Sequence, residues 1–259
     1  LLDASTGEQL ALLDDLSRVA GPARVGDVAL GPDQTIWYTV ASENEYASLW
    51  RLSADEPEPA QVVARGYSPA PSPDGRFLAY IAADESSPSS DPSNVLVVRD
   101  LIDGTERRIG GLVAPDRDAP STPLLTDLAW HPDGDRIAFS FSYGFEREEN
   151  QIAVLDLAAH RTLADATALP GNLTSPSWTD DGVLFAVELF AEFAGRVPVV
   201  RFDDLTAEPI RDVRFGLLGV VDIVAGANVD QVLVRTAEHD VIFALVPGGE
   251  PRLIAQYWP

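Results

Sequence analysis

Residues 130–139 read WHPDGDRIAF, and this stretch decides the fold. Its centre is a turn built on Asp133. Pro132 fixes φ at the first corner of the turn, and Asp133 followed by Gly134 supplies a second corner that tolerates a left-handed backbone. The apolar run after the turn then returns antiparallel to the residues before it. The stretch therefore predicts a β-hairpin.

The same pattern recurs along the chain. Residues 72–80 read SPDGRFLAY and residues 178–186 read WTDDGVLFA, while weaker copies occupy residues 31–38 (GPDQTIWY) and 226–234 (GANVDQVLV). The central turn positions, residues 33, 74, 133, 181 and 228, are spaced by 41, 59, 48 and 47 residues. A β-rich repeat with a period of about 40–50 residues indicates the blades of a β-propeller.

Further strand-like runs follow each hairpin, which gives four strands, A to D, per unit. We predict one all-β domain over residues 1–259, a β-propeller of four-stranded antiparallel blades. Residues 1–16 resemble only a C–D strand pair, so six blades with one incomplete is the favoured count and five the alternative. No stretch shows the periodicity of a long helix. The complete blades are expected at residues 25–65, 67–110, 124–165, 173–213 and 218–256.

The charge of the chain bounds its partners. There are 41 acidic residues against 18 basic ones, a net charge of −23, and every base is Arg. Such a surface repels phosphate backbones, so we expect no nucleic-acid partner and favour a basic, envelope-associated protein. There is no cysteine, which excludes disulfides and thiolate sites. No apolar run approaches the roughly 18 residues of a membrane span, and we expect a monomer.

The repeat resembles a known family. Residues 72–80 and 130–139, and more loosely residues 176–182, are similar to the WD40-like repeat of TolB-type propellers. The actinobacterial LpqB-type lipoproteins carry a similar propeller. Residues 30–38 resemble a streptogramin lyase repeat, except that Gln34 replaces the usual Gly. The resemblance implies the fold and an extracytoplasmic place, periplasmic, secreted or lipid-anchored at the cell envelope, but not a function.

Loop length indicates which face of the propeller binds. The A–B and C–D turns on one face are tight, while the B–C loops and the D–A connection on the other are longer, and long loops on a rigid scaffold commonly carry function. We therefore expect a non-enzymatic binding or scaffolding module that uses this acidic, aromatic loop face. The candidate binding residues are Glu43, Glu45, Tyr46, Tyr143, Phe145, Glu146, Glu148, Glu149, Phe190, Glu192, Phe193 and His239.

Motifs for catalysis are sparse. His131 and His160 are expected in tight turns, and His239 lies in a B–C loop where it could act as a ligand or base. The sequence has no HExxH zinc motif and no GxSxG nucleophile elbow. We expect no cofactor, with calcium possible at Asp84-Glu85. Two alternatives remain open: a lyase or hydrolase built on propeller loops, or the substrate-gating propeller of a prolyl oligopeptidase-type enzyme whose catalytic domain lies elsewhere.

Overall fold

The computed structural model describes most of the blade strands and their tight turns. The described residues are 24–42, 45–53, 58–83, 94–111, 123–142, 150–189, 199–206, 210–212, 220–225, 232–236, 241–244 and 252–256. They form five antiparallel four-stranded sheets, each made of four strands consecutive in sequence. None of the described helices is both long enough and apolar enough to span a membrane.

The sheets follow one another along the chain. The first blade comprises β1 (Arg24–Leu30), β2 (Ile36–Ser42), β3 (Glu45–Leu52) and β4 (Ala60–Val63). The second comprises β5 (Tyr67–Pro71), β6 (Phe77–Ala83), β7 (Asn94–Asp100) and β8 (Glu106–Ile109). The third comprises β9 (Leu124–Trp130), β10 (Arg136–Ser142), β11 (Asn150–Asp156), a 3₁₀ turn η3 (Leu163–Asp165) and β12 (Thr167–Ala168).

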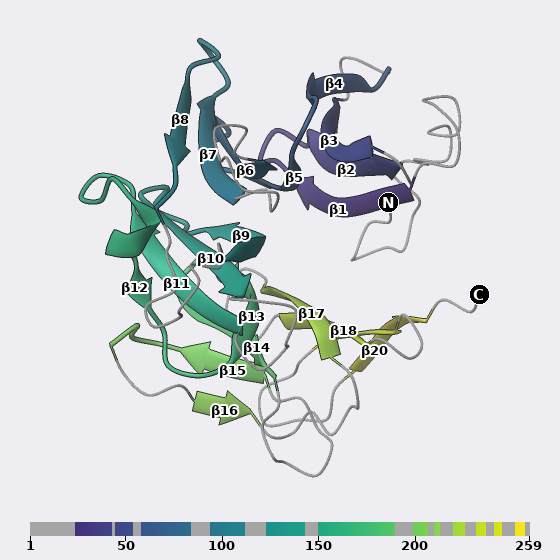
Figure 1. Ribbon diagram of the computed structural model, residues 1–259. Coiled ribbons are helices and arrows are strands. Elements are labelled where there is room, and N and C mark those ends of the chain that lie inside the picture. The colour runs from purple at the N-terminus through teal and green to yellow at the C-terminus, as the bar shows by residue number, and fades with distance from the viewer. Residues whose placement is uncertain are drawn as a thin grey trace.

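The last two blades have the same order. The fourth comprises β13 (Leu173–Trp178), β14 (Leu184–Glu188), β15 (Val199–Phe202) and β16 (Ile210–Asp212). The fifth comprises β17 (Val220–Ala225), β18 (Val232–Thr236), β19 (Val241–Ala244) and β20 (Arg252–Gln256). Consecutive innermost strands contact one another, from β1 through β5, β9 and β13 to β17. Figure 1 shows the five sheets side by side along an arc.

The prediction of an all-β propeller with antiparallel blades is confirmed. The favoured count of six blades is wrong for the described residues, which form five sheets. The half-blade expected at residues 1–16 lies outside the described residues. The fourth strand of the third blade, β12, lies beyond residue 165, where the sequence pattern ends that blade. Its two residues, both exposed, leave no apolar alternation to detect.

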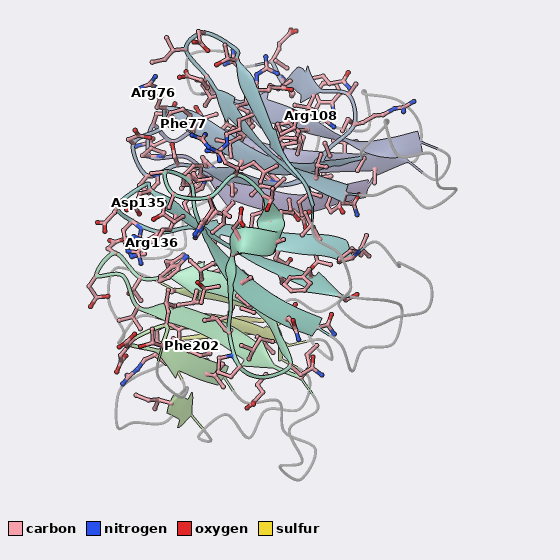
Figure 2. All side chains as sticks on the ribbon, turned by 60° about the vertical axis from the view of Figure 1, so that its left-hand side comes forward. Arg76, Phe77, Arg108, Asp135, Arg136 and Phe202 are labelled. Carbon is pink, nitrogen blue, oxygen red and sulfur yellow. The ribbon has the colours of Figure 1, made fainter. Side chains whose placement is uncertain are left out.

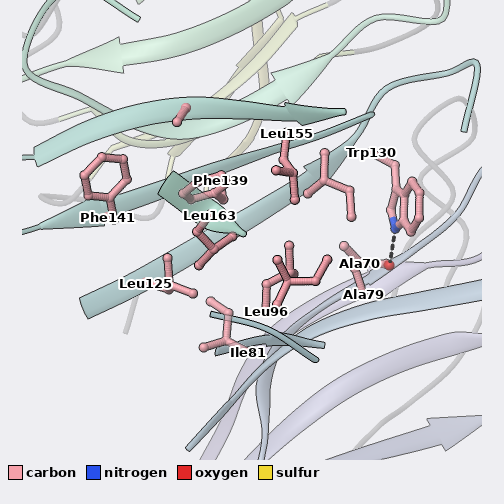
Figure 3. Packing of buried hydrophobic residues seen from close by; sticks show 13 residues of the cluster. Ala70, Ala79, Ile81, Leu96, Leu125, Trp130, Phe139, Phe141, Leu155 and Leu163 are labelled. Carbon is pink, nitrogen blue, oxygen red and sulfur yellow. Dashed lines mark hydrogen bonds between the residues drawn. The ribbon is translucent and has the colours of Figure 1, made fainter. Parts of the chain in front are cut away.

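The core lies between consecutive sheets. Residues alternate between the two faces of a strand, so Ile137, Phe139 and Phe141 of β10 pack toward the second blade, while Ala138 packs toward the fourth. Both faces of the strand are buried, which explains the nearly continuous apolar run after each turn. Figure 3 shows the cluster between the second and third blades, including Trp130.

A polar network links the innermost strands near the middle of each strand. The carboxylate of Asp27 in β1 accepts hydrogen bonds from the backbone N–H of Ser68 at 3.1 Å and from its hydroxyl at 3.3 Å. The carboxylate of Asp127 in β9 accepts one from the hydroxyl of Ser140 in its own blade at 2.7 Å and one from the hydroxyl of Thr174 in β13 at 3.4 Å. The strand register shifts at this level in all five blades. We assign these carboxylates to joining blades, since each accepts a hydrogen bond from the innermost strand of the next blade.

Candidate functional site: a cleft on the turn face

The A–B turns form one face of the propeller, and their geometry is the predicted one. In the third blade the backbone N–H of His131 donates to the carbonyl of Arg136 at 2.9 Å, and that of Gly134 donates to the carbonyl of His131 at 2.9 Å. Gly134 has φ of 75°, and Gly75 has φ of 71° at the same place in the second blade. Glycine carries no steric penalty in this left-handed region.

In the second and fourth blades the side chain two residues before the central Asp caps the turn. In the second blade the hydroxyl of Ser72 donates to Asp74 at 2.6 Å and accepts from the backbone N–H of Phe77 at 2.8 Å. The bond from the Ser72 hydroxyl, and then one from the backbone N–H of Arg76, hold the pKa of the Asp74 carboxyl below its usual range. The polar groups of the turn are therefore hydrogen-bonded to one another, and these bonds fix the position of Phe77, the first residue of β6.

A cleft of about 430 Å³ opens on this face between the second and third blades. Its apolar lining comes from Phe77 at the start of β6, Trp130 at the end of β9, Val98 and Leu157. The rings of Phe77 and Trp130 stack with centroids 6.4 Å apart. Figure 2 shows Phe77 and Asp135 on the same edge of the molecule, from neighbouring blades. The remaining lining residues are Asp100, Thr105, Glu106, Arg107, Gly134, Asp135 and Ala158.

Trp130 is fixed at the base of this cleft. Its indole N–H donates to the carbonyl of Ala70 in the second blade at 2.7 Å, the dashed line in Figure 3, and the residue is only 8% exposed. A Cβ added to Gly134 would meet nothing within 4 Å, so the space above the turn is open. The indole is thus held in place and mostly buried, while the turn beside it is open.

The outer end of the cleft is also fixed. The guanidinium of Arg107 in β8 donates to the carbonyl of Leu157 at 2.6 Å and to that of His160, both in the C–D turn of the third blade. The backbone N–H of Leu163 donates to the carbonyl of Gly110 at 2.9 Å. Because the second blade is tied to the third on both sides, the cleft is preformed, which lowers the ordering cost of binding.

The carboxylate groups at the rim differ in what they bind. Asp100 is buried, and it accepts bonds from the backbone N–H of Ile102 at 2.8 Å and from Nε of Arg76 at 3.0 Å. The first of these bonds is the main cause of a lowered pKa for its carboxyl. Asp135 is 55% exposed at its side chain and lies 3.3 Å from Nε of Arg136. The Asp100 carboxylate therefore stabilises the C–D turn of the second blade, while the Asp135 carboxylate is exposed to solvent at the rim of the cleft.

His131, Asp133 and Asp135 form a group with the residue types of a metal site. One potential ligand atom from each lies within 4.8 Å of the others. However, the guanidinium of Arg136 stands 2.8 Å from Nε2 of His131 and pairs with both carboxylates. Burial, and then the charge of Arg136, lower the pKa of His131. The Arg136 guanidinium thus takes the place that a metal ion would need, so we interpret these three residues as stabilising the turn rather than binding a metal.

The sequence-predicted site residues lie elsewhere. Glu45 and Tyr46 were expected in a loop but belong to strand β3, because β2 ends at Ser42 and Ser42 pairs with Glu45. The first B–C connection is therefore short, a correction to the expected long loop. The side chains of Glu45 and Tyr46 lie outside the described residues, as do the rest of the candidates: Glu43, Tyr143, Phe145, Glu146, Glu148, Glu149, Phe190, Glu192, Phe193 and His239.

Other expectations can be checked directly. His131 lies in an A–B turn and His160 in a C–D turn, as predicted. Asp84 and Glu85, the possible calcium ligands, lie outside the described residues. Sequence reasoning missed the cleft on the tight-turn face. One available signal was Trp130, a large aromatic three residues before the turn Asp.

Comparison with solved structures places this fold. The chain is similar to TolB from Acinetobacter baumannii (TM-score 0.64, 16% identity), with 89% of this chain covering 54% of that one. The chain has the β-propeller fold. A putative TolB from Agrobacterium tumefaciens gives a TM-score of 0.60 at 19% identity, over 92% of this chain and 83% of that one.

A third similar structure comes from an enzyme. The β-propeller domain of the Trilobed protease from Pyrococcus furiosus gives a TM-score of 0.57 at 14% identity, over 90% of this chain and 71% of that domain. No protein-family model matches the sequence, and no curated protein is significantly similar to it. At these identities the likeness shows the fold alone, which this chain shares with the TolB structures and with the protease propeller domain. This chain spans about half the length of the Acinetobacter protein.

Proposed function

We propose that this β-propeller is a non-enzymatic binding module that acts outside the cytoplasm on a protein partner. The observation that carries the proposal is the preformed cleft between the second and third blades. Its aromatic base is fixed by the bond from Trp130 to Ala70, and the Phe77 ring stacked on that base is half-buried. Fixed aromatic surface that is partly desolvated is the usual anchor of a protein interface.

The binding face in this proposal is the tight-turn face, not the loop face favoured by the sequence. The loop-face candidates lie outside the described residues and carry no geometry. His239, on which the enzymatic alternative depends, lies among them. The extracytoplasmic place is supported by the likeness to TolB structures, and a basic partner is supported by the net charge of −23.

Site-specific photo-crosslinking tests this proposal. Ala158 is exposed and lines the cleft from the C–D turn of the third blade. Ile102 is 80% exposed and occupies the same position in the C–D turn of the second blade, outside the lining of the cleft. In both turns the backbone N–H donates to the preceding Asp at 2.8 Å. The two positions therefore make a matched pair.

A benzophenone amino acid is placed at residue 158 or at residue 102 of the full protein in its native cells. We expect a discrete protein adduct from position 158 that is absent from position 102. Blocking the cleft with Thr105→Trp in the same chain should remove the adduct. Equal adducts at both positions, or none at position 158, would refute binding through the cleft.

A further inference from the structure

We propose that the cleft selects an arginine side chain of an extended peptide segment, with its aliphatic stem along the apolar lining beside Phe77 and its guanidinium at Asp135. This inference rests on the proposed function, because it names the chemistry of the partner at the same site. It follows from three features of the cleft: its rings, its rim charges and the state of the bases around it.

The rings supply a surface that a guanidinium prefers. Arg76 already places its guanidinium carbon 4.9 Å from the centroid of Phe77. That arginine is held there by Asp100, whose carboxylate lies 2.8 Å from one of its terminal nitrogens. The chain thus shows, at the wall of the cleft, the combination of one ring and one carboxylate that binds a guanidinium. Asp135 supplies a second carboxylate in the lining, while Trp130 contributes only the small part of its ring that is exposed, 8% of the residue.

The charges of the lining favour a cation. The ionisable lining residues are three acids, Asp100, Glu106 and Asp135, and one base, Arg107. Both terminal nitrogens of that base donate to backbone carbonyls of the third blade, and its charge stays, so the ionisable lining carries three negative charges and one positive charge. An anionic ligand would meet this acidic rim and the field of a chain with net charge −23, whereas a cation is attracted by both.

The three carboxylates differ in how many of their hydrogen-bonding positions are already used within the chain. Asp100 is buried and bonded to Arg76 and Ile102. Glu106 accepts from the hydroxyl of Tyr80 at 2.9 Å and lies 3.5 Å from Arg99. Asp135 keeps 55% of its side chain exposed, and its contact with Arg136 is a surface pair at 3.3 Å. Surface pairs of this kind are weak, so Asp135 is the carboxylate that an incoming guanidinium reaches.

The shape of the cleft favours a side chain that is apolar along its length and charged at its end. The aliphatic stem of arginine would lie along Leu157 and Val98, which line the cleft with the rings. A planar guanidinium stacks on aromatic faces and hydrogen-bonds a carboxylate in the same plane, which the compact ammonium of lysine does less well. Arginine can therefore contact the apolar lining with its stem and pair with the carboxylate at the rim with its guanidinium.

Fluorescence anisotropy with defined peptides tests the inference. The probes are labelled ten-residue peptides with a central arginine flanked by leucines, and the same peptide with citrulline, which keeps the shape but has no charge. We expect the arginine peptide to bind at least about tenfold more tightly than the citrulline peptide, which corresponds to about 1.4 kcal/mol. The salt concentration is held constant, because long-range attraction to the acidic chain weakens as salt rises.

Variants separate the cleft from the rest of the acidic surface. Ala158→Trp should abolish binding of the arginine peptide by filling the cleft, while Ile102→Trp should leave it unchanged. Asp135→Asn should weaken it about three- to tenfold and reduce the preference over citrulline. Circular dichroism and thermal unfolding check that each variant is folded.

Two outcomes would overturn the inference: equal affinity for the arginine and citrulline peptides, or equal binding to the Ala158 and Ile102 variants. A cleft-specific protein adduct in cells together with no preference for arginine would refute the inference alone. Absence of that adduct would instead refute the proposed function. The two failures are therefore distinguishable.

Discussion

The junction between the second and third blades and the junction between the third and fourth blades are built from the same repeat, yet they differ on the turn face. In the first, Trp130 lies at the base of an open cleft. In the second, Trp178 occupies the same repeat position, but the ring of His131 packs edge-on against it with centroids 4.7 Å apart. Gly182 also lies against that ring.

The residue two places before the turn Asp accounts for this difference. In the second blade it is Ser72, a small side chain that folds back to cap its own turn. In the third blade it is His131, whose ring extends toward the next blade. The two indoles are almost equally buried, at 8% and 9% exposure, but Phe77 covers Trp130 whereas His131 covers Trp178. This repeat position thus contributes to how each junction is filled.

The largest expected effect is at Trp130. Trp130→Ala removes a buried indole and leaves the carbonyl of Ala70 without its donor. We expect the free energy of unfolding to fall by about 3–5 kcal/mol. Urea denaturation followed by circular dichroism measures it. A loss below about 1 kcal/mol would contradict the role of Trp130 as the fixed base of the cleft.

Replacing Trp130 or Trp178 by phenylalanine tests the contribution of the indole hydrogen bond at each junction. Trp130→Phe should cost about 1–3 kcal/mol, because it orphans a buried carbonyl. The indole N–H of Trp178 is buried without a hydrogen-bond partner in the described structure. Trp178→Phe should therefore cost less than Trp130→Phe, and the reverse order would show that the two junctions do not differ in this way.

Alanine at the turn glycines tests how full each junction is. Gly182 has φ of 84° and its added Cβ would lie 3.0 Å from Nε2 of His131, whereas at Gly134, with φ of 75°, the added Cβ meets nothing within 4 Å. Backbone strain costs about 1–3 kcal/mol at either site. We expect Gly182→Ala to be more destabilising than Gly134→Ala, as measured by thermal unfolding. Equal losses would argue against the crowding of the filled junction.

His131→Ser converts the filled junction toward the open one. Loss of the contact with Trp178 should cost about 0.5–1.5 kcal/mol near neutral pH. Burial, and then Arg136, lower the pKa of His131 in the folded protein, so folding favours the neutral ring. The stabilisation is present above the unfolded pKa of about 6.5 and is lost as pH falls through the lower, folded value.

The stability difference between the wild type and His131→Ser should therefore shrink from pH 7.5 to pH 5. Denaturation curves at the two pH values measure it. A difference that grows on acidification would mean that His131 is stabilised in its charged form. Because the other titrating groups are common to both proteins, the comparison isolates this ring.

The smallest effect is expected in the first blade. Gln34 adopts φ of 65° at the place where the second, third and fourth blades have glycine. Gln34→Gly relieves a left-handed residue but frees the unfolded chain, so we expect a stabilisation below about 1 kcal/mol. A shift in the thermal midpoint measures it, and a clear destabilisation would show that the Gln34 side chain contributes more than its backbone costs.

Much of the fold followed from local pattern. The turns at Asp74 and Asp133 form as predicted because their hydrogen bonds lie within a few residues. The short strand β12 and the short connection after Ser42 did not follow, since neither has an apolar alternation of its own. The candidate site was not predicted, because Phe77 and Leu157 meet only when two blades pack together.

The sequence by itself determined the repeat, the Asp-centred turns and the acidic charge, and these are properties of short segments or of composition. Tertiary structure alone decided which junction stays open, because that depends on side chains from separate blades competing for one space. Trp130 and Trp178 are equivalent in the repeat, and only their neighbours across the junction distinguish them. The stretch at residues 130–139 thus predicts a hairpin, while packing makes its first residue the base of a cleft.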